Sequence, residues 1–179
     1  DMGVGVHNPS TAERIQPQLA TSEAALERAL ETAQAVHEER DWLDVPPAER
    51  ADLLDKVADV LEARVPELAM VEALTTGIVL NLNMMLNAIT HLAFRAAAEM
   101  LRTGWTDSTL PGPHGEVEVM RRPWGVAVCI VPWNSPAPLA AHKVANALAA
   151  GCATILKPSE WAPYSSRFIA EAIEEVGLP

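Results

Sequence analysis

Two short apolar runs, each followed by a segment of helical character, constrain the fold of this chain more than any other feature. The runs occupy residues 125–131 and 153–156 and show no regular alternation of polar and apolar residues. Such runs are typical of strands that are covered on both faces, as in a parallel sheet. Residues 136–150 and 163–176 follow the two runs, and each of these segments ends at a glycine, as helices commonly do.

This strand–helix–strand–helix order has the spacing of right-handed crossover connections. It predicts an α/β fold in which a helical layer precedes the first units of a doubly wound, Rossmann-like parallel sheet. Two parallel strands alone leave an open sheet edge and bare apolar faces. We therefore expect an incomplete domain, so that either further chain or a partner supplies the remaining strands.

The residues before Gly104 have the apolar periodicity of helices. We expect helices over residues 21–40, from Pro47 onward, from Pro66 to Gly77 and over residues 80–102. Thr21 or Ser22 is suited to cap the first helix, and Pro47 to open the second. The apolar stripes that define the second and fourth helices are Leu54, Val57, Ala58 and Leu61, and Met85, Ile89, Leu92 and Ala96.

The segment between the helical layer and the sheet has a different character. Pro111, Gly112, Pro113 and Gly115 predict a loop. Acidic and apolar residues alternate over residues 116–120, which is typical of a half-exposed strand. The sequence thus predicts one loop and one strand here.

Charge and cysteine content limit the kind of protein. The formal net charge of −11 argues against a nucleic-acid partner, because phosphates would be repelled. Residues 79–101 form the longest helical stretch, but polar side chains interrupt it too often for a membrane span. Cys129 and Cys152 both lie in apolar runs, and we interpret them as buried thiols of a reducing compartment. Residues 1–15 have no signal-peptide pattern, so we expect a cytoplasmic protein.

Two common cofactor patterns are missing from the sequence. No Gly-x-Gly-x-x-Gly follows either apolar run, so the standard dinucleotide fingerprint is absent. The histidines are scattered and the two cysteines lie far apart, so no metal-ligand spacing is present. Any nucleotide or reactive site must therefore be argued from the strand ends.

The turn after the first apolar run carries a candidate hydrogen-bond donor, since ligands of open α/β sheets bind at the carboxyl ends of strands. Pro132 and Pro136 stiffen the turn that holds Trp133 and Asn134. A fixed asparagine amide can stabilise a developing oxyanion, an interaction worth about 3–4 kcal/mol in other enzymes. The alternative is that Asn134 only fills the turn or caps the next helix.

Lys157 and Glu160, which follow the second run, are suited to bind ribose hydroxyls, the ammonium donating and the carboxylate accepting. A carboxylate would also disfavour a 2′-phosphate, as acids do in other dinucleotide-binding folds. The alternative is a solvated charge pair beside a helix start. Lys143 and His142 lie on the alanine-rich helix and, on pattern alone, are typical surface residues. Neither cysteine is predicted to have the exposure and positive surroundings of an activated thiol.

From residue 122 to residue 179 the chain strongly resembles the aldehyde dehydrogenase superfamily. The matching elements are Arg122-Pro123-Trp124-Gly125, Pro132-Trp133-Asn134, Lys143, Ala147-Leu148-Ala149-Ala150-Gly151, Lys157-Pro158-Ser159-Glu160 and Gly177-Leu178-Pro179. Their order and spacing are specific when taken together. More loosely, residues 8–11 resemble the early turn of the family, residues 47–50 its second-helix start, and residues 76–77 a helix end.

The resemblance implies a role for each matched position. Asn134 corresponds to the side-chain donor of the oxyanion hole, and Lys143 to a lysine near the nicotinamide half of the cofactor. Lys157 and Glu160 resemble the residues at the adenosine ribose. The residues implied to bind the cofactor are Ile130, Val131, Pro132, Trp133, Lys157, Pro158, Ser159 and Glu160. The implied cofactor is NAD, with NADP as the alternative, and the implied partners are a small-molecule aldehyde and either a homo-oligomer or a complementary chain.

In this family a cysteine thiolate attacks the aldehyde, hydride passes to the nicotinamide, and a water activated by a glutamate hydrolyses the thioester. By the resemblance, which covers about the first third of a family member, the thiol, the base, the second cofactor-binding acid and the glycine-rich turn lie beyond Pro179. Residues 1–104 then form the helical part of the cofactor-binding domain, residues 105–122 an oligomerisation-related segment, and residues 123–179 the start of the NAD(P)-binding sheet. The catalytic domain is expected outside this chain, which alone should be inactive.

The chain departs from the family pattern at several positions. Ile78 follows the helix-ending Gly77 where a basic residue is usual, and Ser135 and Ala137 stand where many members have bulkier apolar residues. Two other readings stay open. One is a truncated, non-catalytic relative that binds a partner chain through its exposed sheet edge. The other is a relative that reduces acyl thioesters or forms an acyl-CoA, because the N-terminal motifs do not separate these activities.

Overall fold

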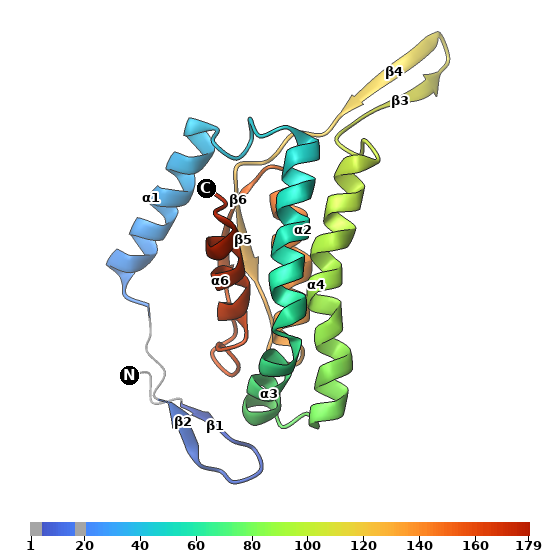
Figure 1. Cartoon of the computed structure of the whole chain (residues 1–179). Coiled ribbons are helices and arrows are strands. Elements are labelled where there is room, and N and C mark those ends of the chain that lie inside the picture. The colour runs from blue at the N-terminus through green and yellow to red at the C-terminus, as the bar shows by residue number, and fades with distance from the viewer. Residues whose placement is uncertain (1–4, 17–20) are drawn as a thin grey trace.

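The structure, a computed structural model, describes residues 5–16 and 21–179. In this part of the chain the first half contains strands β1 (Val6–His7) and β2 (Arg14–Gln16) and helices α1 (Glu23–Glu39), α2 (Pro47–Ala63), α3 (Val65–Thr76) and α4 (Leu80–Arg102). The second half contains β3 (Asp107–Gly112), β4 (Gly115–Met120), β5 (Val126–Ile130), α5 (Pro136–Ala149), β6 (Ala153–Lys157) and α6 (Ser166–Val176). The hairpin of β3 and β4 projects from the body of the molecule (Figure 1).

Local signals in the sequence set the bounds of the first helices. Ser22 Oγ accepts a hydrogen bond from Ala25 N at 3.2 Å, so Ser22 caps α1 as predicted. Pro47 is the first residue of α2, where its missing N–H costs no helical hydrogen bond. Gly77 ends α3 with a φ of 78°, a conformation that a side chain would strain. The four predicted helices are therefore confirmed, with ends within a few residues of those expected.

The hydrophobic core lies where α2 and α4 pack against α5 and α6. Phe94 of α4 and Phe168 of α6 are the largest fully buried side chains in it. The stripe predicted for α2 is confirmed, because its members Leu54, Val57, Ala58 and Leu61 are all fully buried. Removal of this apolar surface from water is the main favourable contribution to folding.

Helix α4 buries a different face from the one that its apolar stripe indicates. An apolar stripe normally faces the core, yet Met85, Ile89 and Leu92 are 73%, 47% and 50% exposed. The residues that α4 buries are Asn83, Asn87, Thr90, His91, Phe94, Ala97, Ala98 and Leu101. The physical reason is a buried acid on α3, Glu72, which accepts a hydrogen bond from Asn87. A polar neighbour thus turns the amide face of α4 inward.

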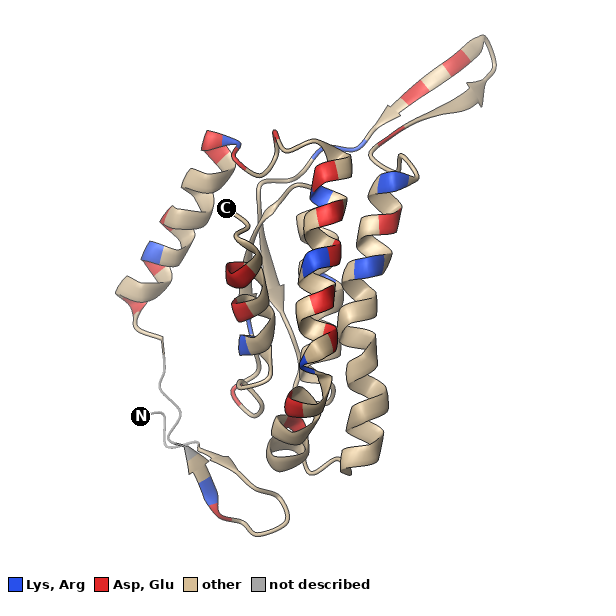
Figure 2. Ribbon diagram, in the orientation of Figure 1, with Lys and Arg blue, Asp and Glu red and all other residues tan. Residues whose placement is uncertain are grey.

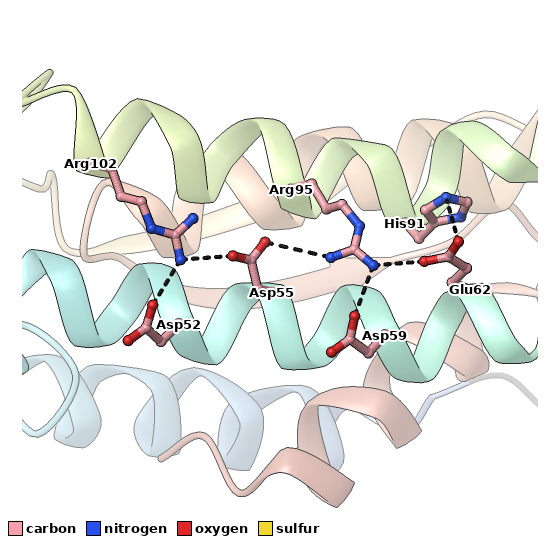
Figure 3. A network of polar contacts seen from close by, with 7 residues as sticks. All are labelled: Asp52, Asp55, Asp59, Glu62, His91, Arg95 and Arg102. Carbon is pink, nitrogen blue, oxygen red and sulfur yellow. Dashed lines mark hydrogen bonds and ion pairs between the residues drawn. The ribbon is translucent and has the colours of Figure 1, made fainter.

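Charged side chains join α2 to α4 along their exposed sides. Acids line α2 and arginines lie on α4, whereas the half of α4 nearest α3 carries no Lys, Arg, Asp or Glu (Figure 2). The network consists of Asp52, Asp55, Asp59 and Glu62 on α2 with His91, Arg95 and Arg102 on α4 (Figure 3). Arg95 lies 2.8 Å from Asp59 and 2.6 Å from Glu62. Exposed pairs each stabilise little, so this network mainly fixes how the two helices are aligned.

The segment between the two halves is a hairpin and not a loop with a single strand. Strand β3 includes Pro111 and Gly112, which the sequence pattern placed in a loop, and the turn is confined to Pro113 and His114. Pro111 lies opposite Glu116 in the antiparallel register. Because β3 pairs with one strand only, a proline without an N–H is tolerated on it.

Strands β5 and β6 are parallel, as predicted, with Val126 opposite Ala153 and Ile130 opposite Lys157. Within this chain only one face of the pair is well covered, as expected of two parallel strands without the rest of their sheet. Val128 and Ile130 are 52% and 61% exposed, although Cys129 between them is buried. The reason is that side chains alternate along a strand: Cys129 faces the core, so Val128 and Ile130 point to the opposite face of the pair.

Candidate active site at the carboxyl ends of the parallel strands

The loops that follow β5 and β6 lie side by side. Ile130 is opposite Lys157, and Val131 N donates a hydrogen bond to Lys157 O at 3.1 Å. Residues 132–135 and 158–160 therefore leave the sheet at the same edge, where open α/β sheets bind their ligands. The structure thus brings the polar residues of both predicted turns together.

Asn134 lies exposed in the turn between β5 and α5. Ser135 occupies the N-cap position of α5, and no side-chain oxygen caps this helix. The alternative that Asn134 caps the helix is therefore excluded. Among the residues that the structure describes, none forms a hydrogen bond with the Asn134 side chain, so its amide remains available to a ligand.

A carboxyl group from another helix holds the start of α5. The N–H of Ala137 donates to Glu72 Oε1 at 2.9 Å, and Glu72 itself is 1% exposed. Sequence reasoning missed Glu72, because no motif contains it. The signal that was available is a single acid within the apolar run of residues 68–74. Charged residues are almost never fully buried unless they have partners.

Lys143 extends from α5 to the end of β5. Its Nζ donates a hydrogen bond to Ile130 O at 2.7 Å. The ammonium group is therefore hydrogen-bonded to a backbone oxygen at the end of the strand, and the side chain does not extend freely into solvent. This contact places Lys143 beside the candidate cofactor wall.

Lys157 and Glu160 form an ion pair at the end of β6. Lys157 Nζ lies 3.4 Å from Glu160 Oε2, and the side chains are 56% and 43% exposed. The pKa of Glu160 is lowered, first by a hydrogen bond from its own backbone N–H and then by the hydrogen bond and charge of Lys157. Because both groups are open to solvent, they can exchange their mutual bond for bonds to hydroxyls. The geometry fits a ribose-binding pair as well as a solvated pair.

The residues predicted to bind the cofactor differ in exposure. Exposed or half-exposed are Ile130, Pro132, Trp133, Lys157, Pro158 and Glu160. The side chains of Val131 and Ser159 are buried, so these two residues support the wall from behind and do not line it. Ser159 Oγ accepts a hydrogen bond from Trp161 N at 3.3 Å, which fixes the turn after β6.

A hollow lies between the β1–β2 pair, the end of α3 and the strand-end loops. Trp133 and Trp161 contribute aromatic surface to it, and Thr75 and Thr76 lie at the α3 side. The two threonine hydroxyls donate to backbone oxygens within α3 at 2.8 and 2.7 Å. Since these hydroxyls are already used, the hollow presents mainly aromatic surface to a ligand.

The two thiols have the properties of core residues. Cys129 and Cys152 are both free and buried. Burial raises the pKa of the Cys129 thiol, and the charge of Lys143 opposes this only in part. A buried thiol with a raised pKa is a poor nucleophile. Both cysteines are thus buried core residues, and their lack of activation as thiols stays a prediction.

Over residues 5–16 and 21–179, no three side chains of His, Cys, Asp or Glu are grouped in a way that could hold a metal ion. Over the same ranges, no helix combines the length and apolar character that crossing a bilayer requires.

Comparison with known proteins places this geometry in a family. The sequence profile described as "Aldehyde dehydrogenase family" matches residues 2–179. The NADP/NAD-dependent aldehyde dehydrogenase PuuC of Escherichia coli is 37% identical, over 86% of this chain and 31% of its own length. The phenylacetaldehyde dehydrogenase of Pseudomonas fluorescens is 34% identical, over 100% of this chain and 37% of its own length.

A solved structure agrees in fold as well as in sequence. Aldehyde dehydrogenase C of Pseudomonas syringae, crystallised as a mutant with NAD+ and octanal, is similar with a TM-score of 0.88 at 31% identity. The match covers 98% of this chain and 35% of that structure. The chain spans about a third of the length of the relatives that it matches. On the family profile and on these identities, the chain belongs to the aldehyde dehydrogenase family.

Proposed function

We propose that this chain is the amino-terminal part of an NAD(P)-dependent aldehyde dehydrogenase, which oxidises an aldehyde to a carboxylic acid. The observation that carries the proposal is the exposed Asn134 side chain in a fixed turn at the carboxyl end of β5. The aldehyde dehydrogenase activity for which the Escherichia coli relative is named supports it, as do the NAD+ and octanal in the Pseudomonas syringae structure. The thiol and the base come from outside these 179 residues.

The proposed task of Asn134 is to stabilise the oxyanion that forms when a thiolate attacks the aldehyde carbonyl. Its Nδ2–H donates to the oxygen as negative charge develops there. A donor that is held in place before the reaction costs no reorganisation when the charge appears. Pro136 begins α5 directly after the turn and limits its motion.

The strand-end residues fit the adenosine ribose of a nicotinamide cofactor. Lys157 offers N–H donors and Glu160 offers acceptor oxygens, and both lie open to solvent 3.4 Å apart. Exposed Ile130 provides an apolar surface at the same edge. When bound, the cofactor accepts the hydride, while the residues of this chain bind and orient it. Because a carboxylate repels a 2′-phosphate, we propose NAD as the preferred form.

Replacing Glu160 tests the ribose assignment. In the complete enzyme, Glu160→Gln is expected to shift the preference toward NADP, because the charge that repels the 2′-phosphate is removed. The measurement is kcat/KM for NAD and for NADP in both proteins. Glu175→Gln, at an exposed acid on α6, is the matched control and should leave the ratio unchanged. An unchanged ratio in Glu160→Gln would contradict the assignment.

A non-catalytic binding module is the second candidate function. The exposed apolar side chains of Val128 and Ile130 favour it, because such strand surface is normally covered. Gel filtration and intact mass of the protein from its native source separate the two candidates. A stable 19.3 kDa species that is inactive with aldehydes and NAD supports the module. A longer product with a cysteine and a glutamate at family-like positions supports the enzyme.

The β3–β4 hairpin is the proposed contact with another subunit. It projects from the body of the molecule (Figure 1), and its side chains Leu110, Val117 and Met120 are exposed. Exposed apolar side chains on a projecting ribbon are suited to pair with a second copy of the chain. Equilibrium sedimentation of the wild type and of Leu110→Lys tests this assignment, which predicts a lower association state for the variant.

A further inference from the structure

We propose that Glu72 of α3 is a positioning residue for Asn134, because its buried carboxyl group anchors the start of α5. The inference rests on the oxyanion role proposed above for Asn134. Glu72 and Ala137 are 65 positions apart in the chain. The turn before α5 therefore depends on a contact that its own local sequence does not provide.

The first turn of α5 has an unusual shortage of amide donors. A helix normally begins with several N–H groups that lack a partner within the helix. Here Pro136 and Pro138 have no N–H, and Leu139 N donates to Ser135 O at 3.1 Å. Ala137 thus has the remaining amide of this turn, and Glu72 Oε1 accepts its hydrogen bond at 2.9 Å.

Glu72 takes the place of the missing cap of this helix. The N-cap residue, Ser135, makes no side-chain hydrogen bond to the helix. A capping side chain stabilises a helix start by accepting from the first amides, and a negative charge there also interacts favourably with the helix dipole. Because the accepting oxygen belongs to α3, the bond also fixes the position of α5 relative to that helix.

The carboxyl group of Glu72 is itself held from the other side. Asn87 Nδ2 of α4 donates to Glu72 Oε2 at 2.9 Å and to Asn83 O at 3.0 Å. Asn87 Oδ1 accepts from Thr90 Oγ1 at 3.4 Å. Asn83, Asn87 and Thr90 are fully buried and Glu72 is 1% exposed. In such surroundings a lost partner leaves a costly unpaired group, so the arrangement is rigid.

The anchored amide is close to the candidate donor along the chain. Ala137 follows Asn134 after only Ser135 and Pro136, and the ring of Pro136 fixes its own φ. A displacement of the Ala137 amide therefore displaces the Asn134 side chain as well. Since misplacement of a catalytic group by about 1 Å can cost about 100-fold in rate, the anchor matters for turnover.

A double-mutant cycle in the complete enzyme tests the proposal. Glu72→Ala is expected to lower kcat by about 10- to 100-fold with the KM for NAD unchanged. Asn134→Ala is expected to lower kcat by about 10²- to 10³-fold. If Glu72 acts through Asn134, the double variant is no slower than Asn134→Ala alone, within about twofold. A purely structural role would instead multiply the two losses.

A control and a milder variant keep the test decisive. Glu67→Ala removes an exposed acid from the same helix and should leave kcat unchanged. Glu72→Gln keeps an oxygen for Ala137 N but faces Asn87 with a second amide donor, so its loss should be smaller. If Glu72→Ala does not fold, Glu72→Gln completes the cycle. Multiplicative losses, or no loss in either variant, overturn the proposal. An unchanged kcat in Asn134→Ala alone overturns the proposed function instead.

Discussion

Helices α2 and α4 lie side by side (Figure 1), yet the first half of α4 buries a different kind of surface from α2. Helix α2 buries the apolar stripe that its periodicity predicts, and its acids face outward. The first half of α4 instead buries asparagines and exposes methionines and leucines. The element packed against a helix therefore determines which face of that helix is buried. An apolar stripe packs against an apolar core, whereas amide side chains are buried where a carboxyl group accepts their hydrogen bonds.

Truncating an apolar side chain should lower the free energy of unfolding strongly on α2 and hardly at all in the first half of α4. Leu54 of α2 is fully buried and Met85 of α4 is 73% exposed. We expect Leu54→Ala to lower the free energy of unfolding by about 2–5 kcal/mol, through lost burial and the cavity left behind. Met85→Ala should change it by less than about 0.5 kcal/mol. Urea unfolding measures both changes, and losses of similar size would show that the two side chains are equally buried in solution.

Within α4, truncating a buried amide side chain should destabilise the protein more than truncating an exposed one. Asn87 is fully buried and donates to Glu72, whereas Asn81 on the same helix is exposed. We expect Asn87→Ala to lower the free energy of unfolding by about 1–3 kcal/mol, because it leaves an acceptor of Glu72 unsatisfied. Asn81→Ala is the matched control and should be nearly neutral. Thermal and urea unfolding of the two variants would contradict the account if Asn81→Ala were the more damaging.

The exposed contact between the helices should have the smallest effect, visible in the pH dependence of stability. The pKa of Glu62 is lowered from 4.5, first by the hydrogen bond from Arg95 and then by charge from His91 and Arg95. A carboxyl group with a lowered folded-state pKa contributes stability above its unfolded pKa, and this contribution is lost as pH falls through the folded value. Stability should therefore fall less steeply in Glu62→Gln between about pH 5 and about pH 3.

The control for this titration is Glu99→Gln, at an exposed acid on α4. It removes a carboxylate of the same charge without changing any member of the network. Urea midpoints at several pH values give the slopes. Equal slopes for wild type and Glu62→Gln would show that the network in Figure 3 does not stabilise the folded state.

Features with local causes were predictable from the sequence. The cap at Ser22, the start of α2 at Pro47 and the end of α3 at Gly77 each follow from the chemistry of one residue. The parallel pair followed from apolar runs at crossover spacing. Strand β3 was not predicted, because proline and glycine usually mark loops. Only pairing with β4 makes Pro111 part of a strand.

Features that depend on distant contacts were not predictable. The buried face of α4 depends on which element lies opposite, whereas the exposed Val128 and Ile130 agree with the bare faces expected of two strands alone. In the site, the strand-end rule and the family resemblance indicated Asn134 and Glu160. Neither the strand-end rule nor the resemblance indicated Glu72, because its partner amide is 65 positions away and no spacing in the sequence connects them.

The proposed role of Asn134 as an oxyanion donor is tested by removing its side-chain amide and leaving the cofactor site intact. The kcat of the complete enzyme and the Kd of its cofactor are compared between wild type and Asn134→Ala. The account predicts that kcat falls by about 10²- to 10³-fold while cofactor affinity is unchanged. An unchanged kcat, or an equal loss of kcat and cofactor affinity, would contradict it.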